Sequence, residues 1–82
     1  MEARIATANA IAAAVRKCTT ISIDVRVWQR GDIVRVYVNA GRNCRTKYGY
    51  IDVTDDGIDC REIRGCISES IKAAAQSVTN VA

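Results

Sequence analysis

Two stretches of the chain repeat their apolar residues at three- and four-residue steps, which is the spacing of one face of an α-helix. The first stretch covers residues 3–17, where alanines flank the apolar stripe and raise the helix propensity. The second is expected to begin near residues 59–62, whose acidic side chains suit a helix N-terminus, and to continue to about residue 78. Gly65 costs about 1 kcal/mol relative to alanine inside a helix, so this second helix can also start one turn later.

Between these stretches the pattern changes to strict alternation of apolar and polar residues, which predicts strands with one buried face. Three strands are expected, over residues 21–29, 33–39 and 47–53. Because each strand has a single apolar face, both helices are expected to cover that face and to leave the other face open to solvent. The sequence therefore predicts a single α+β domain over residues 1–82, a three-stranded antiparallel meander in the order α-β-β-β-α.

Short polar segments are expected to join the three strands. A two-residue turn at Arg30 and Gly31 would place Val27 opposite Val34, so that core positions of the first two strands meet. Residues 40–46 have the composition of a connecting loop.

This register also predicts an unfavourable pair on the polar face. Arg26 and Arg35 would lie opposite each other, and like charges in such pairs destabilise a sheet. We therefore expect carboxylates within the chain, those of Asp24 and Asp52, or an anionic partner to offset them.

The polar face of the predicted sheet holds the only tryptophan and all three tyrosines of the chain. The alternation assigns to it Asp24, Arg26, Trp28, Arg35, Tyr37, Asn39, Tyr48, Tyr50 and Asp52. A contiguous patch of Trp and Tyr beside Arg has the composition of a binding hot spot. Aromatic pairs such as Tyr37 with Tyr50 also stabilise a sheet without any ligand, so a purely structural role stays open.

The formal net charge of +3 is small but unevenly distributed. Residues 26–47 are mainly basic and residues 52–69 mainly acidic, so one end of the sheet is expected to be cationic and the other anionic. This net charge is smaller than expected for most nucleic-acid binders, which carry strongly basic surfaces.

The residues that usually carry catalysis or hold metals are scarce. There is no histidine, so the commonest general base is missing and no imidazole can activate a cysteine nucleophile. The four cysteines form no C-x-x-C pair, although a four-cysteine site assembled in space stays open. Asp55-Asp56-Gly57 and Arg30-Gly31-Asp32 are interpreted as turns rather than as a metal pair and an integrin-recognition motif. We predict a protein that is not an enzyme and that uses no metal and no cofactor.

The chain also lacks the features of a membrane or secreted protein. No stretch approaches the roughly 20 apolar residues that span a bilayer, and the alanine-rich start has no leucine or phenylalanine. We expect a cytoplasmic protein with no membrane partner. In that reducing compartment the cysteines are expected to be free thiols, namely Cys18, Cys44, Cys60 and Cys66.

Two classes of nucleic-acid-binding domain share parts of this pattern. The order of elements is similar to that of double-stranded RNA-binding domains, but Asp59 and Glu62 stand where that family has phosphate-binding lysines. Arg26, Trp28 and Arg35 resemble the side chains that plant-type and integrase-arm three-stranded domains project from the sheet to read DNA. The N-terminal helix departs from this second pattern.

A third resemblance concerns the strand sequences in a chain of this size. Arg35-Val36-Tyr37-Val38-Asn39 and the later Tyr48-Gly49-Tyr50-Ile51-Asp52-Val53 resemble small accessory proteins of phages, including anti-CRISPR inhibitors of host defence. This resemblance implies stoichiometric blocking of a host protein without catalysis.

We therefore expect a binding module that engages a macromolecular partner, with a protein favoured over nucleic acid. The residues expected to contact the partner are Arg26, Trp28, Arg35, Tyr37, Arg42, Arg45, Lys47, Tyr48 and Tyr50. In the nucleic-acid alternative the rings stack on bases of a single strand or contact a duplex, while the basic residues of segment 42–47 contact phosphates. A structural protein that forms homodimers through the same face is the second alternative.

Overall fold

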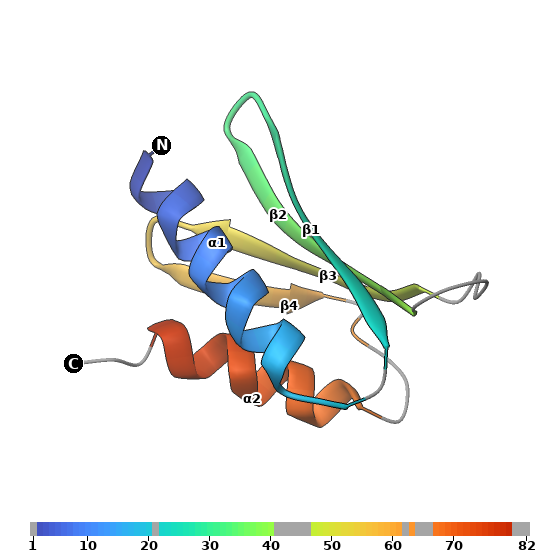
Figure 1. The fold of residues 1–82 in the computed structure, drawn as a ribbon. Coiled ribbons are helices and arrows are strands. Elements are labelled where there is room, and N and C mark those ends of the chain that lie inside the picture. Colours follow the sequence, from blue (N-terminus) through green and yellow to red (C-terminus); the bar gives the residue numbers. More distant parts are fainter. Residues whose placement is uncertain (1, 21, 41–46, 62, 64–66, 80–82) are drawn as a thin grey trace.

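The computed structural model describes residues 2–20, 22–40, 47–61, 63 and 67–79, with the backbone alone at positions 40, 47, 48 and 61. Its elements follow the order α1 (Glu2–Lys17), β1 (Ile23–Arg30), β2 (Ile33–Ala40), β3 (Lys47–Thr54), β4 (Gly57–Arg61) and α2 (Ser68–Thr79). The four strands form one antiparallel sheet in the order β1-β2-β3-β4 (Figure 1). The α+β class is thus confirmed. Neither described helix is long and apolar enough to cross a membrane.

The prediction of three strands in the order α-β-β-β-α was wrong, because a fourth strand follows the third. Asp55 and Asp56 form a turn, and Gly57 then begins β4 by pairing with Thr54. Gly57 has a φ of 144°, a conformation that residues with a Cβ rarely adopt. The turn is therefore a hairpin within the sheet, whereas the sequence suggested a strand-to-helix connection.

Helix α2 begins at Ser68, well after the predicted start near residues 59–62. The acidic residue Asp59, which suggested a helix N-terminus, lies in β4 opposite Asp52. Glu69 is the acidic residue in the first turn of α2, and the amide of Ile71 donates to the carbonyl of Ile67 over 3.0 Å. A short strand with alternating Ile58 and Cys60 thus precedes the helix.

The hairpin of β1 and β2 forms as expected but in a different register. Its turn consists of Gly31 and Asp32, and Arg30 pairs with Ile33. Gly31 has a φ of 58°, as the first central position of the tight primed turns requires. Because the turn starts one residue later than predicted, each pairing shifts by two positions and core residues still face core residues.

This register corrects the predicted opposition of two arginines. Arg26 lies opposite Tyr37, and Arg35 lies opposite Trp28 on one side and Asp52 on the other. Val27 correspondingly faces Val36 and not Val34. The sheet therefore carries no directly opposed pair of arginines between these strands.

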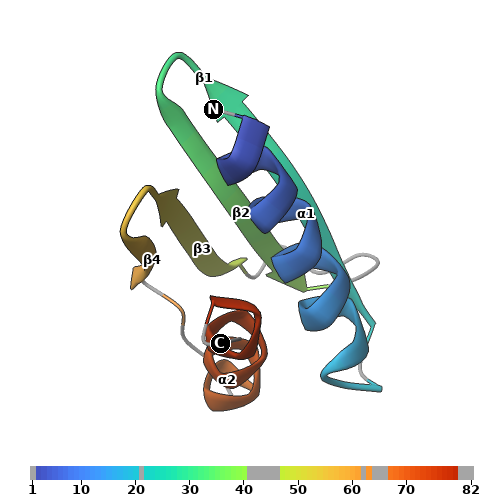
Figure 2. The same cartoon turned by 90° about the vertical axis from the view of Figure 1, so that its left-hand side faces the viewer.

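Both helices lie side by side on the same face of the sheet (Figures 1 and 2). They close an aliphatic core of buried residues, which are Ala8, Ile11, Ala12, Val15, Val25, Val34, Val36, Val38, Ile51, Val53, Ile63, Ile71 and Ala75. Alanines on α1 keep the helix slim, so that it can pack closely against β1 and β2. The alternate positions of the strands therefore point away from the helices.

Candidate binding face of the sheet

The face of the sheet that points away from the helices is here called the open face. Its described side chains alternate with the core residues of the strands. They are Asp24, Arg26, Trp28 and Arg30 on β1, Ile33, Arg35, Tyr37 and Asn39 on β2, Tyr50, Asp52 and Thr54 on β3, and Asp59 on β4. The open face is thus made by all four strands.

Three aromatic rings form a connected cluster in the middle of the open face. Trp28 and Tyr37 meet edge to face, with ring centroids 6.1 Å apart and planes at 79°. Tyr37 and Tyr50 lie at 5.8 Å and 53°, as the predicted cross-strand pair. Such pairs contribute about 0.5–1.5 kcal/mol beyond the area they bury, so the rings hold one another in place. All three side chains are half-buried and retain some exposed surface.

Arg35 is the centre of this cluster. Its Nε donates to Asp52 Oδ1 over 2.6 Å, and its Nη1 lies 3.5 Å from the hydroxyl of Tyr37. Its guanidinium carbon lies 4.5 Å from the ring centroid of Tyr50 and 6.0 Å from that of Trp28, within cation–π range. The bonds to Tyr37 and then Asp52 raise the pKa of the guanidinium above its ordinary value. Arg35 therefore orders the aromatic rings as a permanent cation.

Arg26 has a different environment from Arg35. Its side chain is 76% exposed, against 28% for Arg35, and its Nε donates to Asp24 Oδ2 over 2.8 Å. The expected compensation by Asp24 and Asp52 is thus confirmed, one carboxylate for each arginine. Of these two arginines, Arg26 is the one that presents its guanidinium to solvent.

Arg30 belongs to the open face, whereas the sequence pattern predicted it within the turn. It ends β1 two positions after Trp28, on the same face, and is exposed. The signal that could have placed it correctly is the dipeptide Gly31-Asp32, which is typical of a two-residue hairpin turn. Arg26 and Arg30 thus flank Trp28 along the edge of the sheet.

The structure brings together five of the nine residues predicted to contact a partner: Arg26, Trp28, Arg35, Tyr37 and Tyr50. Arg42 and Arg45 lie outside the described residues. Lys47 and Tyr48 belong to β3, but their side chains also lie outside the description.

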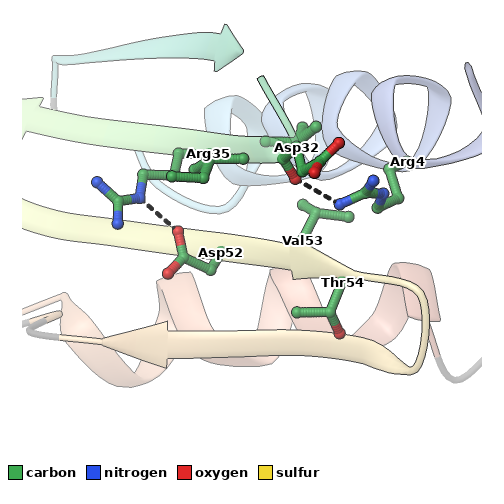
Figure 3. A pocket seen from close by; sticks show the side chains of 8 residues that line it. Arg4, Asp32, Arg35, Asp52, Val53 and Thr54 are labelled. Carbon is green, nitrogen blue, oxygen red and sulfur yellow. Dashed lines mark hydrogen bonds and ion pairs between the residues drawn. The ribbon is translucent and has the colours of Figure 1, made fainter. Parts of the chain in front are cut away.

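A small hollow lies where the two hairpins end (Figure 3). Arg4 of α1 reaches across it and donates from Nη1 to the carbonyl oxygen of Asp32 over 2.6 Å. The Nε of Arg4 lies 3.2 Å from Asp55 Oδ1, close enough for an ion pair but not aligned for a hydrogen bond. Arg4 therefore ties the first turn of α1 to both hairpin turns.

The two described cysteines are both half-buried. Cys18 and Cys60 are free thiols, and burial raises the pKa of both. Cys44 and Cys66 lie outside the described residues. Within the part of the chain that the structure describes, no three Cys, Asp or Glu side chains gather as a metal site requires. The absence of a cofactor stays a prediction.

Comparisons with known proteins find no relative. No protein-family model matches the chain, and neither the curated proteins nor the solved structures contain a match. Functional inference for this chain therefore rests on its own sequence and structure.

Proposed function

We propose that the chain is a non-enzymatic binding module that engages a protein partner through the open face. The observation that carries this proposal is the cluster of Trp28, Tyr37 and Tyr50 around Arg35, on the side of the sheet opposite both helices. Trp, Tyr and Arg dominate the energetics of protein interfaces, and a surface whose side chains are already ordered loses little entropy on binding.

The charges of the open face favour a protein over nucleic acid as the partner. Arg26 and Arg35 are each paired with a carboxylate, and Asp59 lies opposite Asp52 on the neighbouring strand. A phosphate backbone would have to approach these carboxylates and compete with them for the arginines. Because affinity for nucleic acid depends on unneutralised cations, this arrangement suits the mixed charges of a protein surface better.

A matched capture experiment tests the proposal. The tagged wild-type chain and the variants Trp28→Ala and Gln76→Ala are used to capture partners from cells of the source organism. Gln76 is exposed on α2, on the opposite side of the molecule, and serves as the control. Since truncation of a hot-spot residue costs at least about 2 kcal/mol, Trp28→Ala is expected to weaken capture by about thirtyfold or more.

Circular dichroism and a thermal melt establish that both variants are folded. Equal capture by the wild type and Trp28→Ala would refute the proposal. An equal loss of capture in Trp28→Ala and in the control Gln76→Ala would also refute it. Release of the partner by nuclease would instead support nucleic-acid binding. In that case, alanines at Arg42, Arg45 and Lys47 should reduce the salt dependence of binding.

We propose a narrower form of this role, a stoichiometric inhibitor of a host-defence complex. Its support is the resemblance of the β2 and β3 sequences to small phage accessory proteins. The neighbouring genes provide a first test, because a phage or defence-island context is expected. An interference assay in which the chain is co-expressed with the defence complex provides the second, with Trp28→Ala as the inactive variant.

A further inference from the structure

We propose that the chain forms a weak symmetric dimer in which β1 pairs antiparallel with β1 of a second copy, in a register centred on Val27. β1 is an edge of the sheet, and at eight residues it is as long as the central strands, whereas the opposite edge β4 has five. The proposal goes beyond the binding role of the open face and does not depend on it.

The turn between β1 and β2 determines which backbone N–H and C=O groups of β1 point away from β2. Arg30 and Ile33 flank the two-residue turn and form its closing hydrogen-bonded pair, so Trp28 and Arg26 also bond to β2. The N–H and C=O groups of the odd positions then point away from β2. The bond of 2.7 Å from Arg16 Nη2 to the carbonyl oxygen of Val25 agrees with this, because that oxygen faces away from the sheet. A carbonyl oxygen has two lone pairs and can accept a second hydrogen bond from an incoming strand.

The side chains of β1 are self-complementary in the register centred on Val27. This pairing places Asp24 opposite Arg30 of the second copy, and symmetry repeats the opposite-charge pair. It also places Arg26 opposite Trp28 of the second copy, within reach of a cation–π contact. All of these positions are non-hydrogen-bonded pairs of the new ladder, where side chains approach most closely, with Cα atoms about 4.5 Å apart.

The neighbouring registers are disfavoured by charge. In a β1–β1 register centred on Arg26, Arg26 of one copy lies opposite Arg26 of the other. In a register centred on Trp28, Arg26 of one copy lies opposite Arg30 of the other. Like charges directly opposite each other destabilise a sheet. Repulsion between arginines thus disfavours these two shifted registers, whereas the register centred on Val27 places no arginine opposite another.

Apolar surface at the edge of the core gives the same pairing a second source of stability. Ile23 and Val27 lie on the helix side of β1 but are only half-buried, unlike Val25 between them. In the proposed dimer Val27 meets Val27 of the second copy. The two open faces then join into one surface with two copies of Trp28 near its centre, which would let the dimer engage a partner bivalently.

Sedimentation velocity over a concentration series tests the dimer, because an interface this small is expected to associate only weakly, up to about 1 mM. Asp24→Arg and Arg30→Asp should each abolish or weaken association at least tenfold. The double variant with both substitutions exchanges the charges and should restore it. Restoration is the decisive result, since only a register that places these positions opposite each other predicts it.

Two further variants control for effects on folding and for other edges. Gln29→Pro removes an outward N–H that β2 does not use, so it should give a folded monomer. Asp59→Arg on β4 should leave association unchanged. A wild-type chain that stays monomeric at about 1 mM, or a folded double variant that does not regain the dimer, would overturn the proposal. Neither result would affect the capture of a partner through Trp28.

Discussion

The side chain of Arg35 contacts side chains on three neighbouring strands and so orders the middle of the open face. It reaches Trp28 on β1, Tyr37 on its own strand and both Tyr50 and Asp52 on β3. Its cation is neutralised within the chain, so its main effect is to hold the aromatic rings in position. Arg26, on the edge strand, is paired with Asp24 and is largely exposed to solvent.

This difference predicts unequal effects of two alanine substitutions. Arg35→Ala removes the hydrogen bonds to Asp52 and Tyr37 and leaves the Asp52 carboxylate without its cation, so the melting temperature should fall clearly. Arg26→Ala removes a single exposed pair and should change the melting temperature little. Thermal melts followed by circular dichroism compare the two, and equal melting temperatures would contradict the role assigned to Arg35.

The two turn glycines provide a second prediction at the residue scale. Nothing lies within 4 Å of a Cβ built on Gly31 or Gly57, so any cost of substitution comes from the backbone. Asparagine tolerates the φ of 58° at Gly31 but not the φ of 144° at Gly57. Gly31→Asn should cost a few tenths of a kcal/mol and Gly57→Asn about 1–3 kcal/mol. Urea unfolding measures both, and the reverse order would show that the turns differ from those described.

At the scale of elements, sequence patterns predict those parts of the fold whose local and tertiary signals agree. The alternation of β1, β2 and β3 and the apolar stripe of α1 locate these elements to within about two residues. β4 was missed because Asp59 is equally suited to a helix N-terminus and to the open face of a strand. Only its pairing with Asp52 across the sheet decides between these roles, and that contact is not visible in a local pattern.

Because cross-strand contacts are not visible in a local sequence pattern, the candidate site was also predicted only in part. For the predicted open-face residues whose side chains are described, the face follows from a period of two, since a shift of two positions leaves each side chain on its face. The side chain of Tyr48 lies outside the description. Which residues touch depends on the register, so the contacts of Arg35 with Trp28 and Asp52 replaced the predicted contact with Arg26. Arg30 entered the site for the same reason.

Core packing between elements predicts a contrast between two isoleucines. Ile51 is fully buried where β3 meets the helices, whereas Ile33 at the start of β2 is 45% exposed. Ile51→Ala should destabilise the fold by about 3 kcal/mol, because it leaves a cavity. Ile33→Ala should cost less than about 1 kcal/mol. Chemical denaturation gives both values. Similar losses of unfolding free energy in the two variants would contradict the assignment of Ile51 to the core.

At the scale of the whole molecule, the two faces of the sheet have separate roles. One face is covered by both helices (Figure 2) and supplies the aliphatic core. The other face carries the aromatic rings and charges. The charge asymmetry of the sequence runs across the strands: among described open-face side chains, the arginines lie on β1 and β2, while Asp52 and Asp59 lie on β3 and β4. Asp24 is the exception. A partner that complements this face would be acidic toward β1 and basic toward β4.

Site-specific photo-crosslinking in the source cells tests most directly whether the open face is the binding surface. The photoreactive residue p-benzoyl-phenylalanine keeps the ring of tyrosine but carries a benzoyl group in place of the hydroxyl. It is placed at Tyr50 in one chain and at the exposed Ala13 of α1 in another. The open-face position is expected to yield a discrete covalent adduct with a second protein, and the helix position none. Adducts from Ala13 alone, or from neither position in a folded and expressed chain, would contradict the assignment of the open face as the surface that binds a partner.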